Sequence, residues 1–460
     1  MNNVLLIDFG STYTKITAVD IEQEQVLGTA RGITTVETDI MDGLNQALSV
    51  LFAQTGKLEF KKVLGCSSAA GGLKMIAIGL VPEMTAEAAK RAALGAGAKV
   101  LKVFSHELSE YEIEEIAELK PDIILLAGGT DGGNQKVIVH NAKMLAGLGL
   151  DVPVVVAGNK SVAPTVVKIL AATLSVVRPT ENVMPKLDEL NIEPARIVIR
   201  DIFLKRIVEA KGLNSANKMV DKMVMPTPAA VLTAAELLSQ GGGGEKGLGD
   251  LMVMDIGGAT TDVYSIAKGD PTAGGVSLKG LAEPFGKRTV EGDLGMRYSA
   301  GALLKAAGAD MLAGYAAVSP EEASAYVAKV EADIDYLPQN KTEAQIEIAM
   351  GKACVRLSAD RHVGHLDVYC TPFGISQVQV GKDLTKVMSV IATGGVIVNN
   401  PEPEEILKGI LFDEAVPQVL KPQQPEFFID HDYIMSAMGL LGEEYPAVAV
   451  RMMKKYIINK

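Results

Sequence analysis

The 460-residue chain has no tryptophan, and aromatic residues make up only 5% of it. It has three cysteines, Cys66, Cys354 and Cys370, which are widely spaced and form no CxxC pair. This usage disfavours a disulfide-stapled protein and is typical of the reducing cytoplasm, where we expect this protein to be located. No apolar run approaches the ~18 residues of a membrane span, and no basic segment precedes the first apolar run. We therefore expect neither a membrane span nor a signal peptide.

Clustered positive charge is also absent from the sequence. The chain has 44 Lys and Arg residues against 56 Asp and Glu residues, which gives a formal net charge of −12. A surface that follows the phosphates of nucleic acid needs clustered Lys and Arg. The sequence therefore disfavours nucleic acid as a partner.

Small aliphatic residues and glycine are abundant instead. Hydrophobic residues make up 48% of the chain, and 46 residues are glycine. This composition favours α/β layers, and 460 residues exceed a single core. The glycine-rich segment 240–250 marks a boundary, so we predict a first domain over 1–249 and a second over 250–460. Alternating strand and helix patterns predict an inserted α/β subdomain around 60–160. The C-terminal helix of the second domain could pack back on the first.

Two segments, 4–20 and 251–266, each read as a strand, a glycine turn and a second strand. Asp8 and Asp255 each end an apolar run, two residues before a glycine. In such turns, backbone N–H groups and hydroxyls can bind phosphate, and the acid can hold Mg²⁺ through water. We predict that Asp8 and Asp255 are the catalytic and metal-binding pair. The predicted phosphate contacts are Gly10, Ser11, Thr12, Thr14 and Lys15 in the first turn, and Gly257, Gly258, Ala259, Thr260, Thr261 and Asp262 in the second.

One such turn alone is more often an ordinary hairpin, but two matching copies favour a nucleotide site. A third element, 390–400, reads as a buried strand that ends in Gly-Gly and could lie against an adenine or ribose. Its predicted contacts are Thr393, Gly394, Gly395 and Asn399. The formal GxGxxG at 242–247 follows a helix instead of a strand, so it predicts only a turn.

The three elements in this order resemble the actin/Hsp70/sugar-kinase ATPase superfamily. The matching motifs are DFGSTYTK at 8–15, DIGGATTDV at 255–263 and TGGVIVN at 393–399. The resemblance implies an α/β, actin-like fold with two ribonuclease-H-like lobes and a nucleotide cleft between them. It also implies that ATP and Mg²⁺ are the cofactors. Residues 225–238 are similar to the helix that links the lobes in Hsp70 proteins.

More narrowly, the chain resembles the GlmL/MutL family that occurs with adenosylcobalamin-dependent glutamate mutase. This resemblance rests on 4–15, 121–134, 255–265 and TVEGDLGMRYSAG at 289–301. It implies an ATP-dependent, chaperone-like reactivating factor whose partner is the mutase and which exchanges damaged cobalamin. The mismatch-repair proteins also called MutL are unrelated, and the acidic charge argues against their DNA-binding function.

The sequence departs from the Hsp70 pattern at one position. Hsp70 proteins carry a glutamate before the proline that begins the linking helix, and this glutamate helps to position the attacking water. Here Met225 and Thr227 precede Pro226 and Pro228, and neither can act as a base. The departure predicts a weak Mg²⁺-dependent ATPase or a nucleotide-operated conformational switch.

Two other functions of the same superfamily stay open. A small-molecule kinase would need an acid near the transferred phosphate, and Asp262 and Asp293 are the candidates. An actin-like assembly protein would need no such acid. His362, His365 and Asp367 could bind a metal and Cys66 could be a nucleophile, although both patterns are more often structural. The oligomeric state stays open.

Overall fold

The computed structural model describes residues 2–10, 13–34, 40–67, 73–149, 151–210, 220–371 and 374–459. Its contacts divide the chain into two compact units. The first unit comprises Met1–Val231, Gly280–Ala282 and Gly439–Glu444, and the second comprises Leu232–Lys279, Glu283–Met438 and Tyr445–Lys460. Within the described residues, no helix combines the length and apolar character that crossing a membrane requires.

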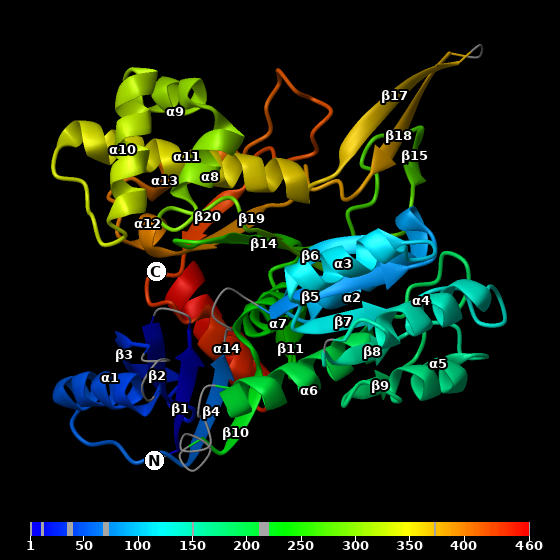
Figure 1. The fold of residues 1–460 in the computed structure, drawn as a ribbon. Helices are drawn as coiled ribbons and strands as arrows, with labels where there is room; N and C mark the ends of the chain where they lie inside the picture. Colours follow the sequence, from blue (N-terminus) through cyan, green and yellow to red (C-terminus); the bar gives the residue numbers. More distant parts are fainter. Residues whose placement is uncertain are drawn as a thin grey trace. The chain divides into compact units, whose positions relative to one another are not determined.

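The first unit contains a five-stranded sheet in the order β10-β4-β1-β2-β3 (Figure 1). The strands β1 (Asn3–Phe9), β2 (Tyr13–Asp20) and β3 (Gln25–Ile33) form an antiparallel meander. The strands β4 (Lys62–Ser67) and β10 (Lys222–Pro226) run parallel to β1. The helix α1 (Ile40–Thr55) buries Leu44, Ala47, Leu48 and Leu51, which is the apolar face that its spacing predicts.

The second unit repeats this sheet, in the order β16-β14-β13-β19-β20. Its antiparallel meander is β13 (Leu251–Ile256), β14 (Thr261–Ile266) and β16 (Gly286–Glu291). The strands β19 (Ser389–Thr393) and β20 (Glu426–Ile429) run parallel to β13 and β19 respectively. Strand order and strand directions are the same in both units. The predicted α/β, actin-like fold class with two related lobes is confirmed.

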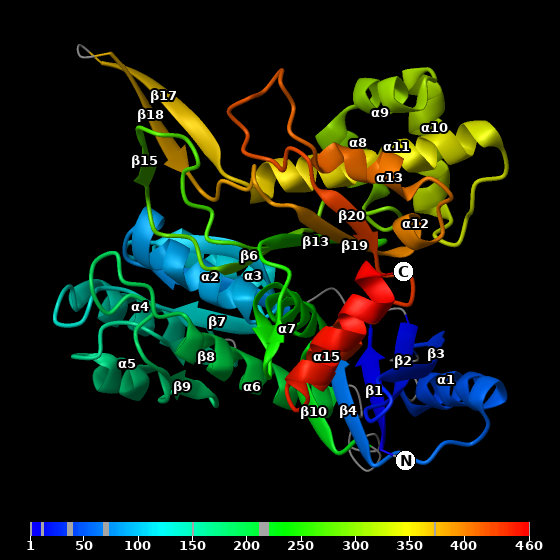
Figure 2. The ribbon, with the colours of Figure 1, turned by 180° about the vertical axis from the view of Figure 1, so that it is seen from behind.

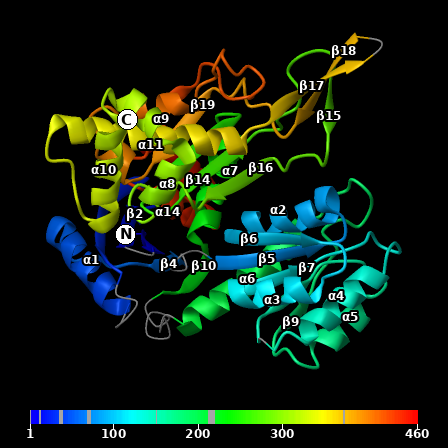
Figure 3. The ribbon, with the colours of Figure 1, turned by 45° about the horizontal axis from the view of Figure 1, so that its top comes forward.

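Helices of the second unit lie on one side of its sheet, as Figures 1 and 2 both show. They are α8 (Ala300–Ala307), α9 (Ala309–Ala316), α10 (Pro320–Ala332), α11 (Lys341–His362), α12 (Gly395–Val398) and α13 (Pro403–Leu407). The unit also has a three-stranded sheet of β15 (Val276–Lys279), β17 (His365–Thr371) and β18 (Gly374–Val380). In Figure 3 the β17–β18 hairpin extends away from α8–α11.

The first unit carries an inserted sheet of parallel strands in the order β6-β5-β7-β8-β9. These strands are β5 (Leu73–Gly79), β6 (Ala98–Ser105), β7 (Ile123–Leu126), β8 (Val154–Val156) and β9 (Val177–Pro179). The accompanying helices are α2 (Glu87–Gly95), α3 (Glu110–Leu119), α4 (Lys136–Ala146), α5 (Ala163–Leu170) and α6 (Glu193–Ala210). The β-α-β alternation in the sequence therefore does produce a doubly wound parallel sheet.

The remaining elements include α7 (Thr227–Gln240), α14 (Met435–Gly442) and α15 (Pro446–Met453). The segment with the formal GxGxxG forms a short hairpin of β11 (Gly241–Gly242) and β12 (Glu245–Lys246). Gly241, Gly243 and Gly244 have positive φ there. The motif is therefore a turn, as its position after a helix predicts.

The sequence patterns predict a helix over 183–190, a helix start at Asp383 and a helix cap at Thr85, and these three predictions are wrong. Residues 183–190 form no helix, and an isolated bridge joins Lys186 to Glu189. No helix begins at Asp383, because its carboxylate binds the amide and hydroxyl of Thr385 in a turn. Thr85 does not cap α2, because its hydroxyl accepts hydrogen bonds from the amides of Leu80 and Val81. At Asp383 a side chain bonds to nearby backbone outside a helix, which competes with helix formation. Thr85 lies within a π-helical turn, Pro82–Ala86, that runs directly into α2.

The helix α10 provides a test of its N-terminal cap. The Ser319 hydroxyl accepts from the Glu322 amide, and the Glu322 carboxylate accepts from the Ser319 amide. We expect Ser319→Ala to lower the free energy of unfolding by about 1 kcal/mol in urea denaturation, because the Glu322 amide loses the hydroxyl that accepts its hydrogen bond. Ser324→Ala, on the same helix, removes only a bond to the Pro320 carbonyl and should cost less. Equal losses would contradict the capping role.

Candidate functional site

Asp8 lies near the end of β1, between two strands that carry polar side chains. In the ladder it pairs with Lys15 of β2 and with Cys66 of β4. Directly paired residues point to the same face of a sheet, so these three side chains form a row. The Thr227 hydroxyl, at the start of α7, donates to Asp8 Oδ1 at 2.6 Å. Thr227 therefore holds the carboxylate in place. The sequence identified this position only as one that lacks a base.

The turn after β1 is closed by glycine. The Gly10 amide donates to the Tyr13 carbonyl at 3.1 Å, and a Cβ at Gly10 would lie 2.5 Å from that oxygen. Only glycine permits this approach. Thr14 is buried and its hydroxyl contacts that of Thr34 at 3.2 Å. The predicted contacts Ser11 and Thr12 lie outside the described residues.

Cys66 is fully buried beside Asp8. Burial, followed by the nearby Asp8 carboxylate, raises the pKa of its thiol well above the usual value. The Thr227 hydroxyl lies 3.8 Å from Cys66 Sγ. The thiolate form, which is the nucleophile, is therefore disfavoured at neutral pH, and Cys66 fits a packing role.

The turn between β13 and β14 is braced by the segment that follows β16. The Gly257 amide donates to the Thr260 carbonyl at 2.9 Å and so tightens the turn. Three carbonyl oxygens of the turn accept hydrogen bonds from that segment. The Gly257 oxygen accepts from Met296 N at 3.1 Å and the Gly258 oxygen from Arg297 N at 2.8 Å. The Ala259 oxygen accepts from Ser299 Oγ at 2.7 Å. The braced backbone is thus held in one conformation by its carbonyl side.

The amide side of the same turn is available. Within the described part of the chain, the N–H groups of Gly258, Ala259 and Thr260 donate to no protein acceptor. Consecutive backbone N–H groups in a turn form a concavity that binds anions. The arrangement can therefore bind phosphate through the backbone, which is the role that the sequence predicted for this turn.

Asp255 is the centre of a second polar row. In the ladder it pairs with Asp262 of β14 and with Thr393 of β19, so the three side chains share a face. Thr393 is buried, and its hydroxyl has no partner within the described residues. A buried hydroxyl without a partner costs free energy, and a ligand or its bound water could satisfy it.

Asp262 forms an ion pair with Arg288 of the same unit. Its Oδ1 accepts from Arg288 at 2.8 Å from Nε and at 2.6 Å from Nη2. Thr260 Oγ1 lies 3.4 Å from its Oδ2. The buried Thr261 hydroxyl donates to the Leu294 carbonyl at 2.8 Å. Asp262 and the Thr261 hydroxyl therefore shape the turn through bonds within the second unit.

The strand end at 393–395 packs on the end of β13. Gly394 has φ of +106°, and a Cβ there would lie 2.2 Å from the Ile256 carbonyl oxygen. Asn399 Nδ2 donates to the Gly395 carbonyl at 2.9 Å. The third predicted element is thus brought directly against the second turn. Gly394 is required by that packing, whether or not a base lies over it.

The two histidines of HVGHLD do not converge. His362 ends α11 and is fully buried, with Thr289 Oγ1 at 2.8 Å from Nδ1 and Ser265 Oγ at 2.8 Å from Nε2. Burial, then Lys287 and Lys382, lower its pKa well below the usual value. His365 lies on β17, 3.5 Å from Asp367. No group of three or more His, Cys, Asp or Glu residues suited to a metal occurs in the described residues.

The two candidate arginines are also engaged within the second unit. Arg297 Nη1 lies 2.7 Å from Glu347 Oε1, and Arg361 donates to both oxygens of Asp293 at 2.7 and 2.9 Å. Arg361 also binds Glu291 at 2.7 Å. The sequence allows both arginines as phosphate or adenine contacts and favours surface salt bridges. In the structure both form ion pairs within the protein.

Comparison with known proteins gives one close match. A protein-family model described as MutL protein matches residues 4–457. A curated relative named Protein MutL, from Clostridium tetanomorphum, is 55% identical over 461 residues, which cover 100% of each chain.

Solved structures are similar only at low scores. The nucleotide-free diol dehydratase-reactivating factor has a TM-score of 0.37 at 11% identity, covering 96% of this chain and 99% of that one. Component A of (R)-2-hydroxyglutaryl-CoA dehydratase from Acidaminococcus fermentans has a TM-score of 0.32 at 11% identity, covering 99% of each chain. At these scores the likeness carries no argument about this chain.

Two adjacent glycines test the packing of the third element on the second turn. We expect Gly394→Ala to lower the free energy of unfolding by at least about 2 kcal/mol, because the positive φ and the Ile256 carbonyl both exclude a Cβ. Gly395→Ala should be close to neutral, since its Cβ would meet nothing nearer than Asn399 Nδ2 at 4.0 Å. Thermal and urea denaturation would measure both. If Gly395→Ala were the more damaging change, the described packing would be wrong.

Proposed function

Because the chain belongs to the MutL protein family, we propose that it is an ATP-binding, chaperone-like reactivating factor for an adenosylcobalamin-dependent mutase. The observation that carries the nucleotide part is the repeated sheet, with an aspartate at the same point of the first strand in each unit. The mutase part rests on the resemblance of the sequence motifs to the GlmL/MutL family.

The residues of the second unit suit a phosphate chain and its metal ion. The free amides of Gly258, Ala259 and Thr260 would bind phosphate oxygens, and the orphaned Thr393 hydroxyl gives a further polar contact. Asp255 would hold Mg²⁺ through water, because Mg²⁺ keeps much of its hydration shell in protein sites. The metal would offset phosphate charge when bound.

The first unit would contribute Asp8, Lys15 and the turn at Gly10. Lys15 would neutralise phosphate charge, and Asp8 would hold Mg²⁺ through water or orient the attacking water. Thr227 donates to Asp8, so the carboxylate presents its remaining lone pairs in a fixed direction. Thr227 is one of the two residues that stand where Hsp70 proteins carry a glutamate. Its hydroxyl binds Asp8 but cannot act as a base, which supports the proposal of a weak ATPase.

The small-molecule kinase is the weaker alternative. It needs a carboxylate able to take a proton from the acceptor hydroxyl. Both candidates are engaged by arginine: Asp262 binds Arg288, and Asp293 binds Arg361. The oxygens that accept from these arginines are therefore already used within the protein.

Nucleotide binding can be tested by thermal shift. We expect Mg-ATP to raise the Tm of the wild type, because a ligand at 100 times its Kd stabilises a protein by about 2.7 kcal/mol. Asp255→Asn should lose most of this rise. The control is Asp250→Asn, which changes an exposed aspartate just before the same strand and should retain it. A wild type without any nucleotide-dependent rise would contradict the proposal.

The partner can be tested with a mutase that has been inactivated during turnover. We expect the protein with Mg-ATP to restore mutase activity, and the Asp255→Asn variant to restore less than the Asp250→Asn control. ATP turnover should rise when the mutase is added. ATP consumption that depends on a small acceptor, and not on the mutase, would support the kinase instead.

A further inference from the structure

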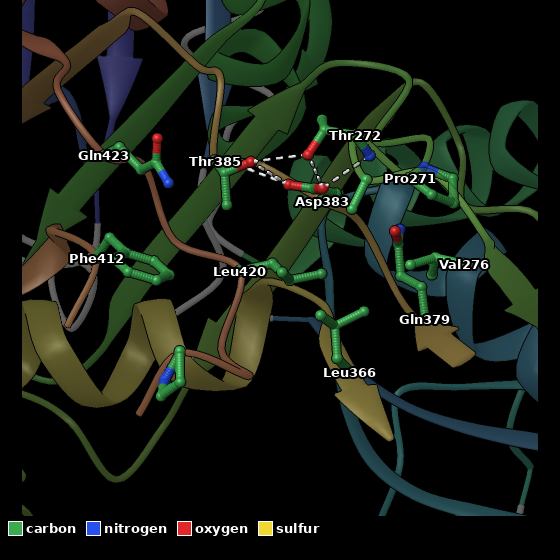
Figure 4. Close-up of a pocket in the computed structure, with 12 residues that line it drawn as sticks. Pro271, Thr272, Val276, Leu366, Gln379, Asp383, Thr385, Phe412, Leu420 and Gln423 are labelled. Atoms are coloured by element: carbon green, nitrogen blue, oxygen red, sulfur yellow. Dashed lines mark hydrogen bonds between the residues drawn. The ribbon is translucent and has the colours of Figure 1, made fainter. Parts of the chain in front are cut away.

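The second unit contains a small pocket whose lining includes none of the predicted phosphate contacts. Its volume is about 180 Å³, and its lining comes from the segment before β15, the strands β17 and β18, and the loop 412–423. Figure 4 shows the cluster of Thr272, Asp383 and Thr385 above the side chains of Leu366 and Leu420.

Gln379 of β18 contributes a fixed acceptor to this pocket. The residue is fully buried, and its Nε2 donates to the carbonyls of Gly269 and Gly381, both at 2.8 Å. These two bonds fix the orientation of the amide, because the flipped form would place Oε1 against the two carbonyl oxygens. In Figure 4 the amide end points toward the side where Pro271 and Asp383 lie.

The carbonyl oxygen of Gln379 lacks a donor. Gln379 Oε1 is buried and has no hydrogen-bond partner within the described residues. An unsatisfied buried acceptor costs about 1–3 kcal/mol, so a donor supplied by a bound molecule would be stabilising. The site therefore lacks a donor, an N–H or O–H group, beside Gln379 Oε1.

The other polar groups also present acceptors and negative charge. Asp383 Oδ2 accepts from the Thr272 amide at 3.1 Å and hydroxyl at 2.7 Å. Asp383 Oδ1 accepts from the Thr385 amide at 3.0 Å and hydroxyl at 2.5 Å. Both hydroxyl hydrogens are thus directed at the carboxylate, which leaves oxygen lone pairs toward a ligand. Among the described lining residues none is Lys, Arg or His.

The rest of the lining is largely apolar, with Val276, Leu366, Phe412 and Leu420 among its side chains. We propose that this pocket binds a small organic ammonium ion, with an N–H that donates to Gln379 Oε1, its positive charge beside the Asp383 carboxylate, and its hydrocarbon part against these walls. An ammonium ion supplies both the donor and the charge that the polar side lacks, and apolar walls suit a hydrocarbon better than a hydrated inorganic cation. The net charge of −12 also favours a cationic ligand.

The proposal can be tested with three probes of the same chain length. n-Butylammonium and butan-1-ol differ only in the polar end, and butyrate carries the opposite charge on a chain of four carbons in all, so calorimetric titration separates charge from apolar burial. We expect n-butylammonium to bind at least about tenfold more tightly than butan-1-ol, a difference of ~1.4 kcal/mol, and butyrate not to bind. Equal binding of the amine and the alcohol, binding of butyrate, or no binding of the amine would each overturn the proposal. In the last case a water molecule on Gln379 would be the simpler reading.

A pair of variants locates the binding. Val276→Phe narrows the pocket from its apolar wall without changing a polar group, and it should weaken n-butylammonium binding at least tenfold. Leu278→Phe adds a ring two residues along the same strand, at an exposed position outside the pocket, and should leave binding unchanged. If circular dichroism shows that both variants are folded and they weaken n-butylammonium binding equally, the amine binds elsewhere and the assignment is overturned.

Discussion

The candidate site depends on the hydrogen-bond ladder around the first strand of each sheet. A strand that is antiparallel to one neighbour and parallel to the other holds three side chains at one level. In the first unit these are Lys15, Asp8 and Cys66, and in the second they are Asp262, Asp255 and Thr393. A shift of one residue in register would turn every member of a row to the other face. The register of backbone pairing therefore decides which three side chains share a face of each sheet.

The two rows are equivalent in position but differ in chemistry. The central aspartate is shared, whereas its neighbours are a lysine and a buried thiol in one unit, and an arginine-bound aspartate and an unpartnered hydroxyl in the other. Duplication accounts for the common backbone, and the neighbours give each copy a separate role. In the proposed function, the first row contributes positive charge and the second contributes backbone amides and the hydroxyl.

Much of this arrangement follows from the sequence, because it is written in local patterns. Apolar runs that end in Asp-x-Gly predict both hairpins, and alternating strands and helices predict the inserted parallel sheet. Contacts between residues distant in the sequence could not be predicted. The bond from Thr227 to Asp8, the arginine on Asp262 and the burial of Thr393 all depend on tertiary packing. The sequence predicts Gly394 as a contact to an adenine or ribose. Its packing against the Ile256 carbonyl already requires a glycine at this position.

The three cysteines differ sharply in accessibility. Cys66 and Cys354 are buried, and burial raises the pKa of both thiols, that of Cys354 to about 12. Cys370 is exposed on β17, in the hairpin that extends from the second unit (Figure 3). The unmodified chain therefore offers a single reactive handle for a maleimide dye. A fluorophore attached there would report, without any engineered cysteine, on molecules that approach this hairpin.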